Sequence, residues 1–333
     1  MGVRIHSFGS FVPRTFVSST ELENILRSKN PSLKIPSGIL ETMTGITRRP
    51  IADDNDQASD LAVRAAESSI TKYGGRLEDI DLLIFASASQ DVSEPATANI
   101  VQTKLGLICP AFDVKNACNS VMSAIEIATA FVNAGMYQNI LIASGEIPSR
   151  VVRHTFDDRD DFKESFPSLT LGDAGGSLLV SYDEQSNVHY QKSYTYGEHW
   201  KLAAFIEGGS MQASTSDGIK FVGDGTALKN AFLSLGDNIV REALSSVGWD
   251  MDDIDQLFIH QVAAGFTAET LQLIGVPANK TYATVEKQGN LASTSLPIAI
   301  TQALDDGTVR VNDKVMVIGL ASGINVSVLL LTI

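Results

Sequence analysis

The stretch DIDLLIFA at residues 79–86 decides the fold, because the chain repeats it in register as DIDQLFIH at residues 253–260. Each copy is an acidic turn that leads into a nearly continuous apolar run, which is typical of a strand buried on both faces. Each copy also follows a segment, residues 59–73 or 228–247, whose apolar positions recur at the three- and four-residue spacing of a helix. The sequence therefore predicts a duplicated α/β unit.

Further matches support the duplication. NILIASG at residues 139–145 parallels KVMVIGLASG at 314–323. In each half, a further segment lies between the two matches, and NACNS at 116–120 pairs there with GNLAS at 289–293. We expect an N-terminal half at 1–180 and a C-terminal half at 181–333. Alternating helices and all-apolar strands predict sheets that helices cover on both faces.

The composition excludes several classes of protein. Lys+Arg of 25 against Asp+Glu of 39 gives 25 − 39 = −14 over 333 residues, which disfavours nucleic-acid and anionic-membrane binding. Two cysteines, Cys109 and Cys118, form neither a disulfide framework nor a metal-ligand cluster, so we expect a reducing cytoplasm and no metal. The apolar run at 326–333 is shorter than the roughly 20 residues of a membrane-spanning helix, and we expect no membrane span.

Three polar residues lie where strands are expected to end and helices to begin. Cys118 directly precedes a predicted helix at 119–133, whose free N–H groups and dipole favour a thiolate. His260 ends the second apolar strand, and Asn290 comes just before another helix-like run. A core cysteine, a structural histidine and a turn asparagine are the alternatives. Equivalent junctions of a repeat can also converge on one site, and that is our hypothesis.

The chain also resembles a known family nearly end to end, namely the β-ketoacyl-acyl carrier protein synthase III branch of the thiolase superfamily. The resemblance is carried by an ordered set of motifs: Thr44-Gly45-Ile46-Thr47-Arg48-Arg49, Pro110-Ala111-Phe112-Asp113-Val114 with Ala117-Cys118, Gly172-Asp173-Ala174-Gly175, His260-Gln261, Gly289-Asn290 with Ser293 and Ser295, and Ala321-Ser322-Gly323.

The resemblance implies a five-layered αβαβα thiolase fold, a homodimer, and Cys118 as the nucleophile that accepts an acyl group. It further implies that His260 and Asn290 hydrogen-bond the thioester oxygen of the second substrate. The backbone amides of Cys118 and Gly323 would form the other oxyanion hole. No cofactor is implied beyond the acyl thioester itself, carried by coenzyme A or by the phosphopantetheine of acyl carrier protein.

Two departures from the family pattern narrow the expected activity. The initiating enzymes carry a Trp and an Arg that hold coenzyme A where this chain has Ile39 and Met43. They also tend to carry an apolar aromatic where this chain has Glu94, before Pro95, whereas head-to-head condensing and pyrone-forming members have a glutamate there. A carboxylate in an apolar channel suits removal of an α-proton, so Glu94 is the candidate base. A solvated loop glutamate and an interface ion pair are the alternatives.

We therefore expect a ketosynthase that joins two acyl thioesters by non-decarboxylative Claisen condensation through acyl-Cys118. With two β-ketoacyl chains the product could cyclise to an α-pyrone, as in polyketide or antibiotic biosynthesis. The alternatives are a decarboxylative synthase III of fatty-acid type and a cysteine-dependent acyltransferase to oxygen or nitrogen acceptors. A non-catalytic partner subunit is disfavoured, because Cys118, His260 and Asn290 are all present.

Docking of an acyl carrier protein would need a local basic patch on this acidic chain, because carrier proteins are acidic. Arg150 and Arg153, together with Arg48 and Arg49, are the candidate docking residues. Aspartates at 157–161 interleave with the nearby arginines, so a self-neutralised surface loop is an equal alternative.

Overall fold

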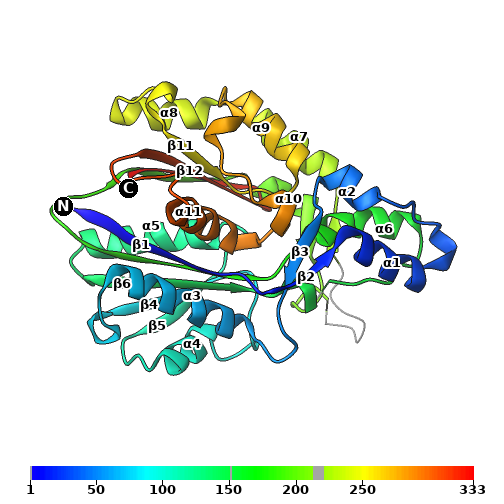
Figure 1. Ribbon diagram of the computed structural model, residues 1–333, viewed down its shortest axis with the longest axis horizontal. Coiled ribbons are helices and arrows are strands. Elements are labelled where there is room, and N and C mark those ends of the chain that lie inside the picture. Colours follow the sequence, from blue (N-terminus) through cyan, green and yellow to red (C-terminus); the bar gives the residue numbers. More distant parts are fainter. Residues whose placement is uncertain (1, 151, 213–220) are drawn as a thin grey trace.

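Two stacked sheets organise the chain, as Figure 1 shows. The computed structural model describes all residues except 1, 151 and 213–220. In spatial order, the first sheet contains β1 (Val3–Phe11), β7 (Ala174–Tyr182), β6 (Asn139–Glu146), β4 (Leu82–Ala86) and β5 (Ala111–Val114). The second sheet contains β8 (Val188–Thr195), β13 (Asn325–Thr332), β12 (Lys314–Ala321) and β11 (Gln256–Ile259).

The two sheets have the same topology. β4 pairs in parallel with β6, and β11 pairs in parallel with β12, while the two strands that follow in each sheet are antiparallel. In the second sheet the place of β5 is taken by an isolated parallel bridge between Leu257 and Thr281. β4 and β11 are fully buried, as their apolar sequences predict.

The repeated acidic turns have the same structural role. The Asp81 N–H donates to the carbonyl oxygen of Asn139, and the Asp81 carboxylate accepts the Asn139 N–H. In the second copy, Asp255 exchanges the corresponding bonds with Lys314. Each turn therefore fixes the start of the central strand against its parallel neighbour.

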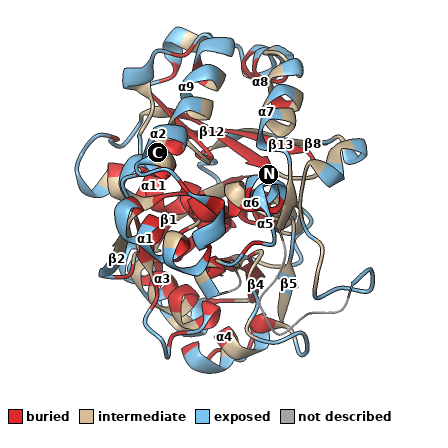
Figure 2. Cartoon of the chain, turned by 90° about the vertical axis from the view of Figure 1, so that its right-hand side faces the viewer, coloured by how far each residue is buried: buried red, intermediate tan, exposed pale blue. Residues whose placement is uncertain are grey.

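Helices form three layers around the two sheets, so the predicted five-layered αβαβα thiolase fold is confirmed (Figures 1 and 2). The middle layer contains α5 (Ser120–Asn133) and α11 (Ser295–Asp305), and its core joins residues of both sheets. α3 (Ala58–Tyr73) and α4 (Thr97–Leu105) cover the outer face of the first sheet. The outer face of the second sheet is covered by α7 (Gly225–Ser234), α8 (Asn238–Val247) and α9 (Ala264–Leu273).

One predicted helix differs from the structure. The segment at 228–247 is not one helix, because α7 ends at Ser234 and α8 begins at Asn238. Gly236 between them has φ of 68°, a left-handed conformation that interrupts a helix and favours glycine. The apolar spacing continued across this break, which is why the sequence predicted a single helix.

A smaller group of elements lies beyond one end of the sheets (Figure 1). It contains β2 (Thr15–Ser18), α1 (Ser19–Lys29), α2 (Ile39–Thr44), β3 (Arg48–Ile51) and α6 (Arg159–Ser165), most of which share an apolar cluster. The remaining short elements are β9 (Ala203–Phe205), β10 (Phe221–Gly223) and α10 (Val285–Gln288).

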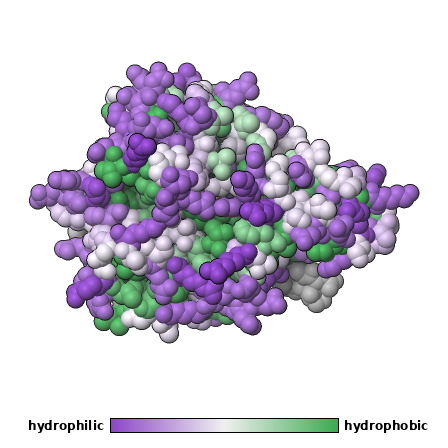
Figure 3. Space-filling model, viewed as in Figure 1, coloured by the Kyte–Doolittle hydropathy of each residue, from purple (hydrophilic) through white to green (hydrophobic). Residues whose placement is uncertain are grey.

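The surface is largely hydrophilic on the face shown in Figure 3, where apolar residues form separate small groups. Within the described part of the chain, every helix is too short or too polar to cross a membrane.

Candidate active site

Cys118 lies on a tight turn between β5 and α5. The helix begins at Ser120 with Asn119 as its N-cap residue, so Cys118 directly precedes the cap. Ala117 has φ of 48°, an uncommon conformation for a residue with a side chain. This turn sets Cys118 at the amino end of the buried helix, as the sequence predicted.

Packing against β12 and β13 fixes this turn. The Asn119 amide donates to the Ser327 hydroxyl at 2.7 Å. A Cβ built on Gly319 would lie only 2.0 Å from Asn119 Oδ1, so a glycine is needed for the turn to approach the strand. Cys118 is therefore held beside the carboxyl end of β12.

The protonation state of Cys118 differs from the expected one. Burial first, and the Glu146 charge second, raise the pKa of the Cys118 thiol from 9.0 to about 12. Any stabilisation of the thiolate by α5 is therefore outweighed by loss of water around the sulfur. The resting group is a neutral thiol at pH 7.

His260 follows the last residue of β11 and is 2% exposed. Its backbone N–H donates to the carbonyl oxygen of Ile318, the residue before Gly319 on β12. Its Nδ1 lies 2.7 Å from Ser295 Oγ, while Nε2 is buried without a partner among the described residues. Burial lowers the pKa of His260 to about 4, so the ring is neutral at pH 7.

Asn290 is held on both sides by backbone bonds and is 6% exposed. Its N–H donates to the carbonyl oxygen of Thr170, and its own carbonyl accepts the Gly172 N–H. The side-chain Oδ1 accepts the Ala292 N–H at 3.0 Å, so the NH₂ group is the end left to donate. Gly289 has φ of 69°, and a Cβ there would lie 2.6 Å from the Thr170 oxygen, so this approach requires glycine.

The structure brings Cys118 and His260 to the carboxyl end of β12, and it links Asn290 to them through the turn before α11, whose Ser295 lies 2.7 Å from His260 Nδ1. Asn119, next to Cys118, contacts Gly319, while His260 bonds the adjacent Ile318. The turn η8 (Ala292–Thr294), which follows Asn290, also contacts α5. The arrangement combines a nucleophile with two buried groups that retain free hydrogen-bonding capacity.

The two backbone amides proposed for an oxyanion hole are also free. Among the described residues, neither the Cys118 N–H nor the Gly323 N–H donates to a backbone carbonyl, and the Cys118 N–H faces its own sulfur. Gly323 has φ of 137°, and the loop that contains it is fixed by Asn325, which bonds Ser322 and Thr195.

The register of the repeat differs from the predicted one at this turn. Ala292 has the same φ of 48° as Ala117, so the counterpart of Cys118 is Ser293, not Leu291. Ser120 donates to the Ala117 carbonyl, and Ser295 contacts the Ala292 carbonyl in the same way. The sequence pairing of 116–120 with 289–293 was therefore wrong by two residues, because backbone geometry rather than hydrophobic pattern fixes the turn.

Glu146 is a buried residue of the site that the sequence analysis missed. It is 1% exposed, and its carboxylate accepts the N–H groups of Ala88 and Ser89 and the hydroxyls of Ser89 and Ser293. Burial raises the pKa of Glu146, and these donors oppose the rise. Its charge in turn acts on Cys118. A charged residue at the end of β6, directly after an apolar run and three small residues, was the signal that could have identified it.

Glu94 lies apart from this buried arrangement within one chain. It is exposed, it precedes Pro95 in the loop before α4, and among the described residues it makes no hydrogen bond or ion pair. The expected apolar channel around its carboxylate is therefore not formed by this chain alone.

The candidate docking arginines divide into two pairs. Arg49 is 3% exposed and Arg153 pairs with Asp161, so these two are not available to a partner, contrary to expectation. Arg48 and Arg150 are exposed. Arg150 donates to the carbonyl oxygens of residues 53 and 54, and Arg48 stacks on Phe16 at 4.3 Å.

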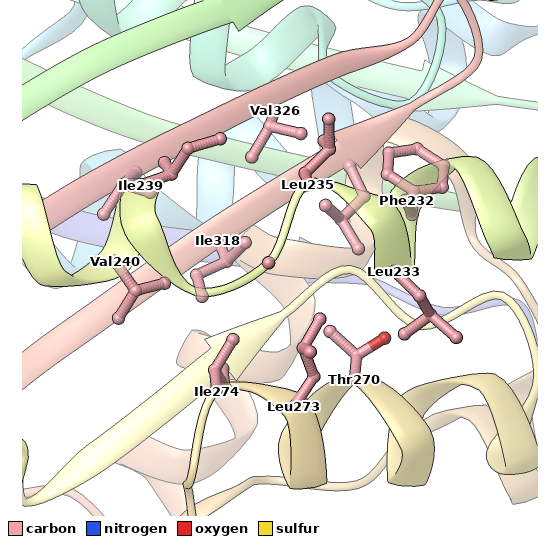
Figure 4. A pocket seen from close by; sticks show the side chains of 13 residues that line it. Phe232, Leu233, Leu235, Ile239, Val240, Thr270, Leu273, Ile274, Ile318 and Val326 are labelled. Carbon is pink, nitrogen blue, oxygen red and sulfur yellow. The ribbon is translucent and has the colours of Figure 1, made fainter.

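Two cavities lie outside the site. A small apolar cavity of about 40 Å³ separates α7, α8 and α9 from β12 and β13 (Figure 4). This volume holds little more than one water molecule, so the cavity does not accommodate an acyl chain. A second cavity of about 300 Å³ lies between α1, β3 and parts of the segments 149–150 and 152–171, and Arg49 and Leu171 are among its lining residues.

Comparisons with known proteins agree with the fold. The family model of 3-oxoacyl-[acyl-carrier-protein] synthase III matches residues 112–197, and the model of its C-terminal part matches 244–333. The β-ketoacyl-[acyl-carrier-protein] synthases III of Neisseria gonorrhoeae and Neisseria meningitidis are 27% identical over 323 residues, with 96% of each chain covered.

Solved structures extend this similarity. OleA of Xanthomonas campestris with bound lauric acid and lauroyl-CoA is 26% identical, with a TM-score of 0.90 over 100% of this chain and 99% of that one. The 3-oxoacyl-[acyl-carrier-protein] synthase III of Aquifex aeolicus has the same fold, with a TM-score of 0.85 at 24% identity over 100% of both chains. The chain is therefore a ketosynthase III-like condensing enzyme with the thiolase fold.

Proposed function

We propose that this enzyme joins two acyl thioesters by a non-decarboxylative Claisen condensation through an acyl-Cys118 intermediate. The observation that carries the proposal is the presence, at the turns around Cys118, of two groups with free hydrogen-bonding capacity among the described residues. They are His260 Nε2, which is buried without a partner, and the NH₂ of Asn290, whose Oδ1 is already bonded. A second thioester oxygen can complete both hydrogen bonds. Stabilising the enolate in this way lowers the barrier to carbon–carbon bond formation.

The first step transfers one acyl group to Cys118. The thiol loses its proton, sulfur attacks the thioester carbonyl, and the carrier thiol leaves with a proton. The free N–H groups of Cys118 and Gly323 stabilise the oxyanion that forms on the acyl oxygen.

The second step requires a base, because an acyl thioester without a malonyl carboxylate must lose an α-proton. Glu94 takes this proton, the resulting carbanion attacks the acyl-Cys118 carbonyl, and the Cys118 sulfur leaves. Since Glu94 is exposed in its own chain, we place it in the site of the second subunit of a homodimer. Glu94 is followed in the chain by α4 and then by β5, which is an edge strand of the first sheet. The outer backbone groups of an edge strand are free to pair with a second subunit, so β5 is suited to the dimer contact.

The OleA structures support this choice. They include variants of a cysteine, a glutamate and a histidine, the residue types proposed here. Two β-ketoacyl chains would give a product able to cyclise to an α-pyrone by enol attack on the remaining thioester. We propose acyl carrier protein as the donor, with exposed Arg48 and Arg150 as docking residues.

A decarboxylative synthase III is the second candidate, because the Neisseria relatives carry that name. Incubation with two non-malonyl acyl thioesters separates the two reactions. We expect a ketone or pyrone and no carbon dioxide, whereas strict dependence on a malonyl thioester would refute the proposal.

Glu94→Gln tests the base directly. Condensation should be lost while mass spectrometry still detects acyl-Cys118. Glu78→Gln removes another exposed carboxylate and is the matched control, for which we expect normal condensation. An unchanged rate of condensation in Glu94→Gln would show that Glu94 is not the base and would support the alternative of a solvated loop glutamate.

A further inference from the structure

The role of His260 depends on which ring nitrogen carries its proton. A neutral imidazole has one N–H, so Nε2 donates only when Nδ1 acts as an acceptor. Nδ1 lies 2.7 Å from Ser295 Oγ, and Nε2 faces no partner among the described residues. The direction of the Ser295 hydroxyl therefore decides whether Nε2 is a donor.

The hydroxyl of Ser295 has one proton and two available acceptors. One is His260 Nδ1, and the other is the Ala292 carbonyl oxygen at 2.9 Å. This carbonyl already accepts the backbone N–H of Ser295, so it keeps a hydrogen bond when the hydroxyl turns away. In the part of the chain that the structure describes, Ser295 Oγ is the one hydrogen-bond partner of Nδ1. Donation to Nδ1 therefore leaves both acceptors bonded.

The first half of the repeat provides an internal comparison. Ser120 occupies the position of Ser295, but its second neighbour is the Asn116 backbone N–H at 2.8 Å. A backbone N–H only donates, so the Ser120 proton must go to the Ala117 carbonyl at 2.7 Å. In the second half an imidazole nitrogen replaces that obligatory donor. Because this nitrogen can accept, the hydroxyl of Ser295 is released from the carbonyl.

We propose that Ser295 is a positioning residue that donates its hydroxyl proton to His260 Nδ1 and thereby fixes the ring proton on Nε2. The Nε2–H group then supplies a second donor to a thioester oxygen, in addition to the NH₂ of Asn290, whose Oδ1 already accepts the Ala292 N–H. An enolate oxygen accepts from both groups, whereas an unprotonated Nε2 would repel it. The use of this tautomer rests on the proposed condensation, but the tautomer itself is a property of the resting enzyme.

Long-range ¹H–¹⁵N correlation spectra of the full-length enzyme labelled with ¹⁵N-histidine test the proposal without any substrate. Protonated and unprotonated ring nitrogens differ widely in ¹⁵N chemical shift. The His260 signal is assigned by its absence in His260→Gln. We expect a neutral ring at pH 7 with the proton on Nε2, and a ring protonated on Nδ1 would overturn the proposal.

Variants of Ser295 test the assignment of this effect to its hydroxyl. Ser295→Ala should shift the ring toward a mixture of tautomers and lower kcat for condensation by roughly tenfold, with little change in KM or in Cys118 acylation. Ser295→Thr keeps the hydroxyl and should restore both the spectrum and kcat. Unchanged Nε2 protonation in Ser295→Ala would show that Ser295 does not set the tautomer. If the wild-type enzyme shows the proton on Nε2 but does not condense two acyl thioesters, the proposed reaction is contradicted and the proposed tautomer is not.

Discussion

Replacing Glu146 by glutamine should make Cys118 more reactive, although the two residues do not bond each other. Glu146 is buried, and its carboxylate is held by donors from Ala88, Ser89 and Ser293. Its negative charge disfavours a second negative charge on the Cys118 sulfur. Glutamine preserves the size of the side chain and removes this charge.

The expected size of the effect follows from the two causes of the pKa rise. Burial first and the Glu146 charge second raise the pKa of Cys118 from 9.0 to about 12, so removal of the charge lowers this pKa and leaves the larger cause, burial, in place. A thiol whose pKa is one unit lower has tenfold more thiolate at pH 8. The thiolate is also less nucleophilic, with a Brønsted slope of about 0.4–0.5, so the net gain in rate is roughly threefold for each pH unit.

Alkylation by iodoacetamide at pH 8, followed by peptide mass spectrometry, measures this gain. Cys109 is buried and remains in every sample as an internal reference. Glu126→Gln is the matched control, because Glu126 lies on α5 behind Cys118 but is exposed, where water screens its charge. We expect no change in that variant.

An unchanged or slower alkylation of Glu146→Gln, with a normal melting temperature, would refute the reasoning. It would mean that Glu146 is protonated in the resting enzyme or that its charge does not reach the sulfur. The same change should make the acyl-Cys118 intermediate less stable to water. A Cys118 thiolate of lower pKa is a better leaving group, so acyl-Cys118 should hydrolyse faster in this variant.

Two further predictions concern stability. Burial lowers the pKa of His260 from 6.5 to about 4, so the contribution of the neutral ring to the free energy of unfolding is fully present above pH 6.5. This contribution, up to about 3 kcal/mol, is lost as the pH falls toward 4. Urea unfolding at pH 7 and at pH 4.5 should therefore show a smaller loss of unfolding free energy for His260→Gln than for the wild type. Gly319→Ala places a Cβ 2.0 Å from Asn119 Oδ1 and should lower the free energy of unfolding by about 2 kcal/mol. Gly265→Ala, which has open space around its Cβ, is the control and should be neutral or stabilising. Equal melting temperatures of the two variants would contradict the packing argument.

Local patterns were sufficient for the sheets and for placing Cys118 and His260 at the junctions where strands end. The acidic turns at Asp81 and Asp255 and the apolar strands after them act through neighbouring residues, and their pattern survives in the sequence. Cys118 and His260 were found because they lie at junctions that this pattern defines. Such junctions are visible without knowledge of the tertiary contacts.

Other features depend on contacts between distant segments. The environment of Glu146 is made by residues 88–89 and 293, which no local pattern connects to residue 146. Burial of Arg49 and the raised pKa of Cys118 likewise arise from packing between layers. The helix N-terminus was a correct local inference at Cys118, but desolvation is the larger effect there.

The repeat also explains why only one of its two equivalent turns carries a nucleophile. Ser293 stands where Cys118 stands in the first half, after an alanine with the same φ of 48°. Ser293 is 1% exposed, and its hydroxyl donates to Glu146, which removes it from reach of a substrate. Since that bond also holds the carboxylate whose charge acts on Cys118, the unused turn of one half helps to set the reactivity of the turn that is used in the other.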